Sequence, residues 1–171
     1  MNMTTFDFGN GSVPAHKHPN GGGWVADTAT VADTAYVGPD AKVFDNARVY
    51  GNAHIYGDAW VYGDAQVYGK AKVYDNAEVF GNARVCSDAR VFENARVSGN
   101  AWVFENAWVY GDAWVFDSAR VYGDTQVFGK AQVYGNAWVY HNAVVYGNAW
   151  VYGNARVYGK AQVFDNAEVA E

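Results

Sequence analysis

The chain has 171 residues, which is enough for one domain with a substantial core. No apolar run approaches the roughly 20 residues of a transmembrane helix, and the formal net charge of −6 argues against a general nucleic-acid binder. The single cysteine, Cys86, excludes an internal disulfide framework, and the N-terminus lacks the features of a secretory signal. We therefore expect a cytoplasmic protein with no nucleic-acid or membrane partner.

Residues 1–24 precede a long repeat and are expected to form an N-terminal cap or arm. The segment TTFDF predicts a short strand, and GNGSVPAHKHPNGGG is interpreted as a glycine-rich loop. His16 and His18 lie two residues apart in this loop and are weak candidates for metal ligands. A polar loop is the ordinary interpretation, because no third ligand is evident nearby.

A six-residue repeat begins at Val25 and continues without insertion to Glu168, giving 24 copies in 144 residues. The first position is Val in every copy except Ile55, and the fifth is Ala in every copy except Thr125. The second position is aromatic in most copies, and the third and fourth are pairs such as Gly-Asn, Gly-Asp or Asp-Asn. We assign residues 25–171 to one repeat domain.

The repeat predicts short strands that are separated by sharp corners. Because successive side chains of a strand point to opposite faces, Ala and Val share one face while the aromatic and the variable sixth residue share the other. The corner residues tolerate positive φ, as a sharp bend requires. We expect four-residue strands wound into a parallel coil with a Val and Ala interior. The copy number fits either two or three corners per coil.

The Val and Ala periodicity over residues 25–168 resembles the hexapeptide-repeat superfamily, the bacterial transferase hexapeptide type. This resemblance implies an all-β fold, a left-handed parallel β-helix of triangular section with 18 residues per coil and about eight coils. It also implies a homotrimer of parallel prisms. The unbroken VYGNA units resemble pure-repeat proteins that are frequent in phage and prophage genomes.

With three corners per coil, every third repeat lies on the same outer face. The first face would carry a column of aromatic residues beside four tryptophans, and we expect this apolar surface to form a subunit interface. Its predicted interface residues are Trp24, Trp60, Trp114, Trp150, Phe44, Tyr62 and Phe116. The alternative is that stacked rings on adjacent coils only stabilise the prism itself.

The second face would carry four arginines that recur on every second coil, about 9.6 Å apart if coils rise by about 4.8 Å. Arginines between aromatic rings can stack on them and bind anions. The predicted ligand-binding residues are Arg48, Arg84, Arg120 and Arg156 with Tyr122, Trp102 and Trp138. The alternative is that these arginines are solvated, paired with corner carboxylates or stacked within the chain.

These observations favour a non-enzymatic structural or interaction protein, a rigid oligomer that presents aromatic-rich faces and needs no cofactor. The alternative is a protein that holds a small anionic or sugar ligand in grooves between subunits. A further alternative is an acyltransferase. Acyltransferases of the superfamily typically place a histidine beside a loop that projects from the coil, and no insertion interrupts residues 25–168.

Overall fold

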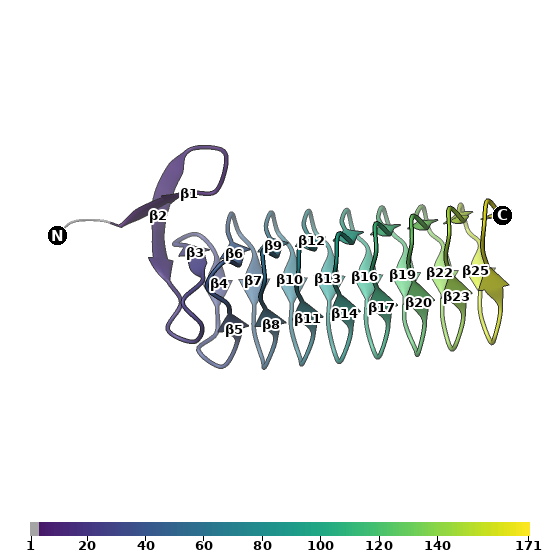
Figure 1. Ribbon diagram of the computed structural model, residues 1–171, viewed down its shortest axis with the longest axis horizontal. Coiled ribbons are helices and arrows are strands. Elements are labelled where there is room, and N and C mark those ends of the chain that lie inside the picture. Colours follow the sequence, from purple (N-terminus) through teal and green to yellow (C-terminus); the bar gives the residue numbers. More distant parts are fainter. Residues whose placement is uncertain (1–3) are drawn as a thin grey trace.

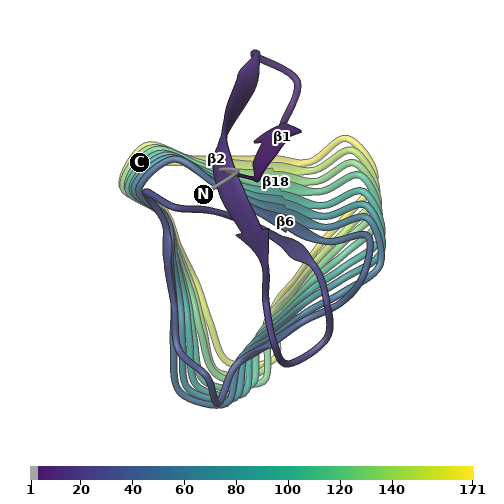
Figure 2. The ribbon, with the colours of Figure 1, turned by 90° about the vertical axis from the view of Figure 1, so that its left-hand side faces the viewer.

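The computed structural model describes residues 4–171 and shows a straight parallel β-helix preceded by a β-hairpin (Figure 1). Viewed along its axis, the helix is a triangle with one sheet on each side (Figure 2). The left-handed parallel β-helix of eight coils is thus confirmed, with three corners per coil.

The first sheet has eleven strands because the hairpin extends it at the N-terminal end. In spatial order its strands are β1 (Thr5–Asp7), β2 (Ser12–Lys17), β3 (Trp24–Ala26), β6 (Lys42–Val43), β9 (Trp60–Val61), β12 (Glu78–Val79), β15 (Arg96–Val97), β18 (Trp114–Val115), β21 (Gln132–Val133), β24 (Trp150–Tyr152) and β27 (Glu168–Ala170). We call the outer side of this sheet the first face.

The other two sheets have eight strands each. The second face is formed by β4 (Thr30–Val31), β7 (Arg48–Val49), β10 (Gln66–Val67), β13 (Arg84–Val85), β16 (Trp102–Val103), β19 (Arg120–Val121), β22 (Trp138–Val139) and β25 (Arg156–Val157). The third face is formed by β5 (Tyr36–Val37), β8 (His54–Ile55), β11 (Lys72–Val73), β14 (Arg90–Val91), β17 (Trp108–Val109), β20 (Gln126–Val127), β23 (Val144–Val145) and β26 (Gln162–Val163).

Most of these strands are two residues long, so the expected four-residue strands are wrong. Only the variable residue and the Val pair regularly with the coils above and below, as in Gln66 with Arg84 and Val67 with Val85. The flanking residues already bend toward the corners. Their amides still bond to the next coil, since the amide of Tyr68 donates to the carbonyl of Val85 at 3.0 Å.

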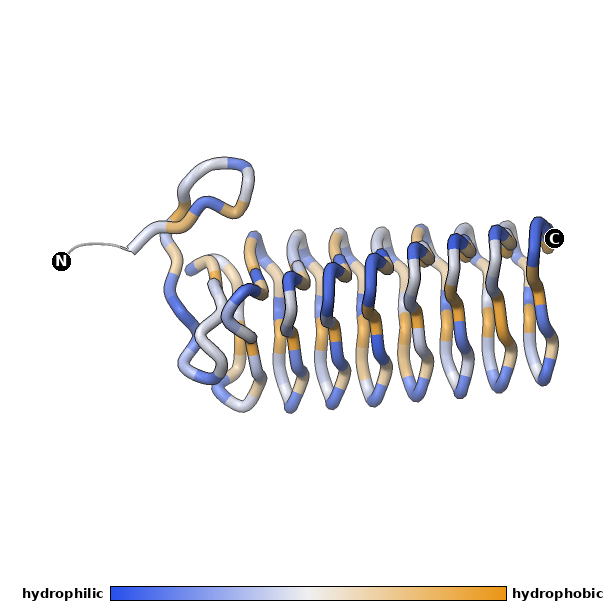
Figure 3. The backbone as a smooth tube through the Cα atoms, in the orientation of Figure 1, coloured by the Kyte–Doolittle hydropathy of each residue, from blue (hydrophilic) through white to orange (hydrophobic). Residues whose placement is uncertain are grey.

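The interior contains the repeated Val and Ala side chains, nearly all of which are fully buried. Hydropathy alternates around each coil for the same reason (Figure 3). The first residue of a corner adopts positive φ, for example Gly57 at 65° and Asp75 at 58°. A Cβ atom on Gly57 would lie 2.7 Å from the amide nitrogen of Asp75, so the close approach of adjacent coils favours glycine there.

The N-terminal segment differs in part from its prediction. The strand expected in TTFDF is present as β1, but the stretch interpreted as a loop contains the six-residue strand β2. β2 pairs antiparallel with β1 on one side and with β3 on the other. It thereby covers the N-terminal edge of the first sheet, which would otherwise present unpaired backbone groups.

Candidate binding surfaces

The aromatic residues of each face form columns of parallel rings. Consecutive rings within a column have centroids 4.7 to 5.4 Å apart and interplanar angles of at most 21°. The broad side of one ring therefore rests on its neighbours, and mainly ring edges point to solvent. This arrangement stabilises the stack of coils and leaves few ring faces on which a sugar could lie.

Two columns are interrupted by a small residue, and a tryptophan fills each gap. On the second face Cys86 replaces a ring, and the indole Nε1 of Trp102 donates to its Sγ at 3.3 Å. On the first face Ser98 replaces a ring, and Nε1 of Trp114 donates to its Oγ at 3.0 Å. Cys86 and Ser98 are each only 5% exposed. Trp102 and Trp114 therefore have a structural role in addition to any role in binding.

Hydroxyl groups of the columns also contact the variable residue of the next coil. Tyr62 donates to Glu78 at 3.0 Å, and Tyr110 donates to Gln126 at 3.1 Å. Burial, and then the hydrogen bond to Glu78, raises the pKa of Tyr62. Burial, and then a hydrogen bond to Cys86, raises the pKa of Tyr68 to about 12.

The first face is divided by the hairpin into a covered part and an open part. Phe6 stacks on Trp24, and Phe8 stacks on Phe44, which is 6% exposed. Trp60 and Tyr62 pack against the same cluster. The predicted interface residues near the N-terminus thus already have intramolecular partners. Trp114, Phe116 and Trp150 lie beyond the hairpin, and Trp150 is 41% exposed.

The structure brings the four predicted arginines into one column on the second face, as the repeat implied. Arg120 and Arg156 lie over the ring of Trp138 at 4.9 and 5.1 Å, and Arg84 lies 5.9 Å from the centroid of Trp102. Within residues 4–171, Arg96 forms an ion pair with Glu78 at 3.5 Å, and His16 lies 2.8 Å from Asp27. The second-face arginines are exposed, and no carboxylate of the described chain forms an ion pair with any of them.

Two adjoining clefts follow this arginine column. A cleft of about 320 Å³ is lined by Asn82, Arg84, Asn100, Trp102, Ser118 and Arg120. A second of about 390 Å³ shares Asn82, Arg84 and Asn100 with the first and extends to Arg48. Tyr122 stacks within its column beside Trp138 and does not line either cleft.

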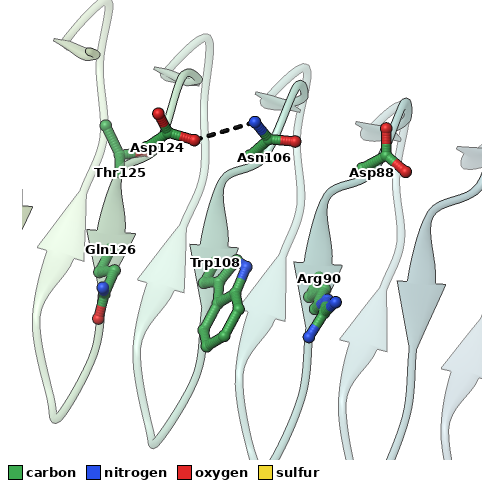
Figure 4. A pocket seen from close by; sticks show the side chains of 7 residues that line it. All are labelled: Asp88, Arg90, Asn106, Trp108, Asp124, Thr125 and Gln126. Carbon is green, nitrogen blue, oxygen red and sulfur yellow. Dashed lines mark hydrogen bonds between the residues drawn. The ribbon is translucent and has the colours of Figure 1, made fainter. Parts of the chain in front are cut away.

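A third cleft, of about 350 Å³, lies on the third face and is shown in Figure 4. Its lining residues are Asp88, Arg90, Asn106, Trp108, Asp124, Thr125 and Gln126. A larger hollow, about 590 Å³, lies beside the hairpin and includes Phe8, Phe44 and Pro14. Neither of these two hollows was predicted from the sequence, although the recurrence of Arg and Trp at matched repeat positions was an available signal for the third-face cleft.

The two histidines of the N-terminal segment do not form a shared site. Nδ1 of His16 lies 2.8 Å from a carboxylate oxygen of Asp27. His18 is 2% exposed, and its Nδ1 lies against the backbone of Asn20. Within residues 4–171, no group of three His, Cys, Asp or Glu side chains is arranged to hold a metal ion.

The coils, columns and corners define a β-solenoid repeat protein. The chain is similar to the YdcK β-solenoid repeat family, whose model matches residues 53–69, 95–111, 131–147 and 149–163, together less than half of the chain. No curated protein and no solved structure matches the sequence. Over the described residues, the structure has no helix long and apolar enough to cross a membrane.

Proposed function

We propose that this protein is a non-enzymatic scaffold, a rigid solenoid that presents aromatic-rich faces to other molecules. The observation that carries this proposal is the separation of inner and outer residues. The interior is packed with Val and Ala apart from Ile55 and Thr125, while nearly all of the chemical variety lies in the outward columns. A similarity of the VYGNA units to phage and prophage repeat proteins supports a phage-encoded origin.

The scaffold assembles as a homo-oligomer through the open part of the first face. Trp114, Phe116 and Trp150 keep exposed surface there, beyond the reach of the hairpin. Large aromatic residues are enriched at the centres of interfaces between subunits. A trimer of parallel prisms is the favoured assembly, on the basis of the resemblance to hexapeptide-repeat proteins.

The oligomeric mass of two matched variants tests this assembly. Trp150 and Trp108 occupy the same repeat position and are 41% and 37% exposed, but they lie on the first and third faces. We expect Trp150→Ser to convert the trimer to monomers in native mass spectrometry, while Trp108→Ser leaves the trimer intact. A monomeric wild-type protein, or trimers from both variants, would contradict the proposed interface.

A further inference from the structure

The repeat builds the same cleft on two different faces. Adding six to each residue number of the second-face cleft gives the third-face cleft: Asn82, Arg84, Asn100, Trp102, Ser118 and Arg120 become Asp88, Arg90, Asn106, Trp108, Asp124 and Gln126. In both clefts an arginine is followed one coil later by a tryptophan, beside a row of corner side chains. Figure 4 shows this arrangement in the third-face cleft. Their volumes, about 320 and 350 Å³, are also similar.

The two clefts differ mainly in charge. The third-face cleft has carboxylates at Asp88 and Asp124 and the neutral Gln126 at its far end. The second-face cleft has neutral hydrogen-bonding groups at the corner positions and a second guanidinium, Arg120, at its far end. The two clefts therefore have similar shapes, but the second-face cleft has a positive lining and the third-face cleft has an acidic rim.

The positive groups of the second-face cleft are available to a ligand. Arg84 and Arg120 are exposed, and neither forms an ion pair within residues 4–171. Indole rings lie beneath both guanidinium groups and restrict where they point. The side-chain amide of Asn82 donates to Oδ1 of Asn100 at 3.2 Å, which leaves the amide of Asn100 as a further donor.

The distance between the two arginines limits the kind of ligand. Arg84 on β13 and Arg120 on β19 are separated by β16, so their backbones lie about 10 Å apart for a coil spacing of about 4.8 Å. One small oxyanion cannot make close contacts with both guanidinium groups when they extend straight outward. A ligand with an anionic group at each end can do so.

We propose that the second-face cleft binds a small elongated ligand with two terminal oxyanions, one at Arg84 and one at Arg120. The middle of the ligand lies over Trp102, between the two arginines. Guanidinium groups bind carboxylate and phosphate oxygens by paired, charge-assisted hydrogen bonds, so either oxyanion suits the site. The neighbouring cleft toward Arg48 gives a longer ligand room to continue, although Asp64 lies on its rim.

Calorimetric titration at low salt with two series of probes tests the proposal. The first series is linear phosphates, from pyrophosphate to longer oligophosphates, and the second is aliphatic α,ω-dicarboxylates of increasing length. We expect affinity to increase with length until the two ends reach both arginines. The series that binds identifies phosphate or carboxylate as the preferred oxyanion.

Matched variants show whether the cleft itself binds. Arg84→Ala and Arg120→Ala should each weaken binding by roughly tenfold or more. Arg90→Ala, in the third-face cleft, should leave affinity unchanged. The triple variant Asn82→Asp, Ser118→Asp, Arg120→Gln gives the second face the lining of the third, and it should abolish binding while circular dichroism stays unchanged.

The absence of binding by every probe to the wild-type protein would overturn the proposal. So would affinity that is independent of probe length, or equal losses for Arg84→Ala and Arg90→Ala. Because the proposed subunit interface is on the first face, the Trp150→Ser variant should bind the probes normally whether or not the oligomer forms.

Discussion

The ring of Phe8 stacks on the ring of Phe44 with centroids 4.9 Å apart and an interplanar angle of 23°. Phe44 is the first ring of its column, because the preceding coil has Ala26 at the equivalent position. Phe8 lies in the hairpin, outside the repeat, and occupies the space that a ring at position 26 would fill. Ala26 is 1% exposed as a result. The hairpin thus completes the aromatic column from outside the solenoid.

Replacement of Phe8 by Ala should release the hairpin without unfolding the coils. Truncation of a buried Phe costs about 3 kcal/mol or more, which is a large part of the stability of a two-stranded ribbon. We expect faster amide hydrogen exchange in Thr5–Asp7 and Ser12–Lys17, and unchanged exchange in β9 and beyond. Val13→Ala is the control, since Val13 is 38% exposed. Equal protection in both variants would show that Phe8 does not hold the hairpin.

Replacement of Trp102 by Ala should expose the thiol of Cys86. The indole covers Cys86 and donates to its sulfur, so its removal opens a path for a thiol reagent. We expect the rate of modification by an aromatic disulfide reagent to increase on the order of tenfold. Trp138→Ala removes an indole from the same column without uncovering the thiol and should not change the rate. A similar acceleration in both variants would indicate general loosening of the coils.

Replacement of Thr125 by Val should stabilise the protein. Thr125 stands at an Ala position, is fully buried, and its Oγ1 has no hydrogen-bond partner in the described structure. Val keeps the shape and removes the unsatisfied hydroxyl, so the free energy of unfolding should increase by about 1 to 2 kcal/mol. Chemical denaturation measures the change. Thr125→Ala also removes the hydroxyl but loses a buried methyl group, so its gain should be smaller. A Val variant less stable than wild type would contradict this account.

The stability of the solenoid should decrease at alkaline pH. Burial is the main cause that raises the pKa of Tyr62, Tyr68 and Tyr74 above the usual tyrosine value of 10.0, and the pKa of Tyr68 reaches about 12. Above pH 10 the unfolded chain loses these protons while the folded chain keeps them, so the folded state binds more protons and loses stability as the pH rises. The stability that these tyrosines give the folded state is fully present below pH 10, and the part that Tyr68 supplies is lost as the pH rises through about 12.

Thermal melts between pH 9 and 12 measure this effect. The Tm of wild type should decrease steeply above pH 10, and Tyr68→Phe should show a smaller decrease because one titrating group is removed. A Tm independent of pH over this range would contradict the predicted linkage.

The coil geometry could be predicted because each residue type repeats its role. Val85 and Ala89 must point inward, and the residues between them must bend the chain. The placement of Arg48, Arg84, Arg120 and Arg156 in one column followed from the number of corners per coil, which the resemblance supplied.

Other features depend on contacts that no periodicity encodes. The glycine-rich composition of the stretch around β2 predicts a loop, yet the open edge of β3 supplies hydrogen bonds that make it a strand. The covering of Phe44 could not be foreseen because Phe8 is outside the repeat. Trp102, which fills the gap at Cys86, lies 16 residues later, and this spacing is not a multiple of the six-residue repeat.

The 18-residue length of each coil, seen in the pairing of Arg48 with Gln66 and of Gln66 with Arg84, has a consequence for how such a chain can change length. Loss of one hexapeptide would leave the Val and Ala interior intact but would rotate every later residue onto the neighbouring face. The downstream arginines would then leave their column, and rings would meet new partners. Loss of 18 residues would shorten the prism and keep each face in phase. Gene slippage in steps of 54 nucleotides would therefore preserve the surfaces, whereas steps of 18 nucleotides would preserve only the fold.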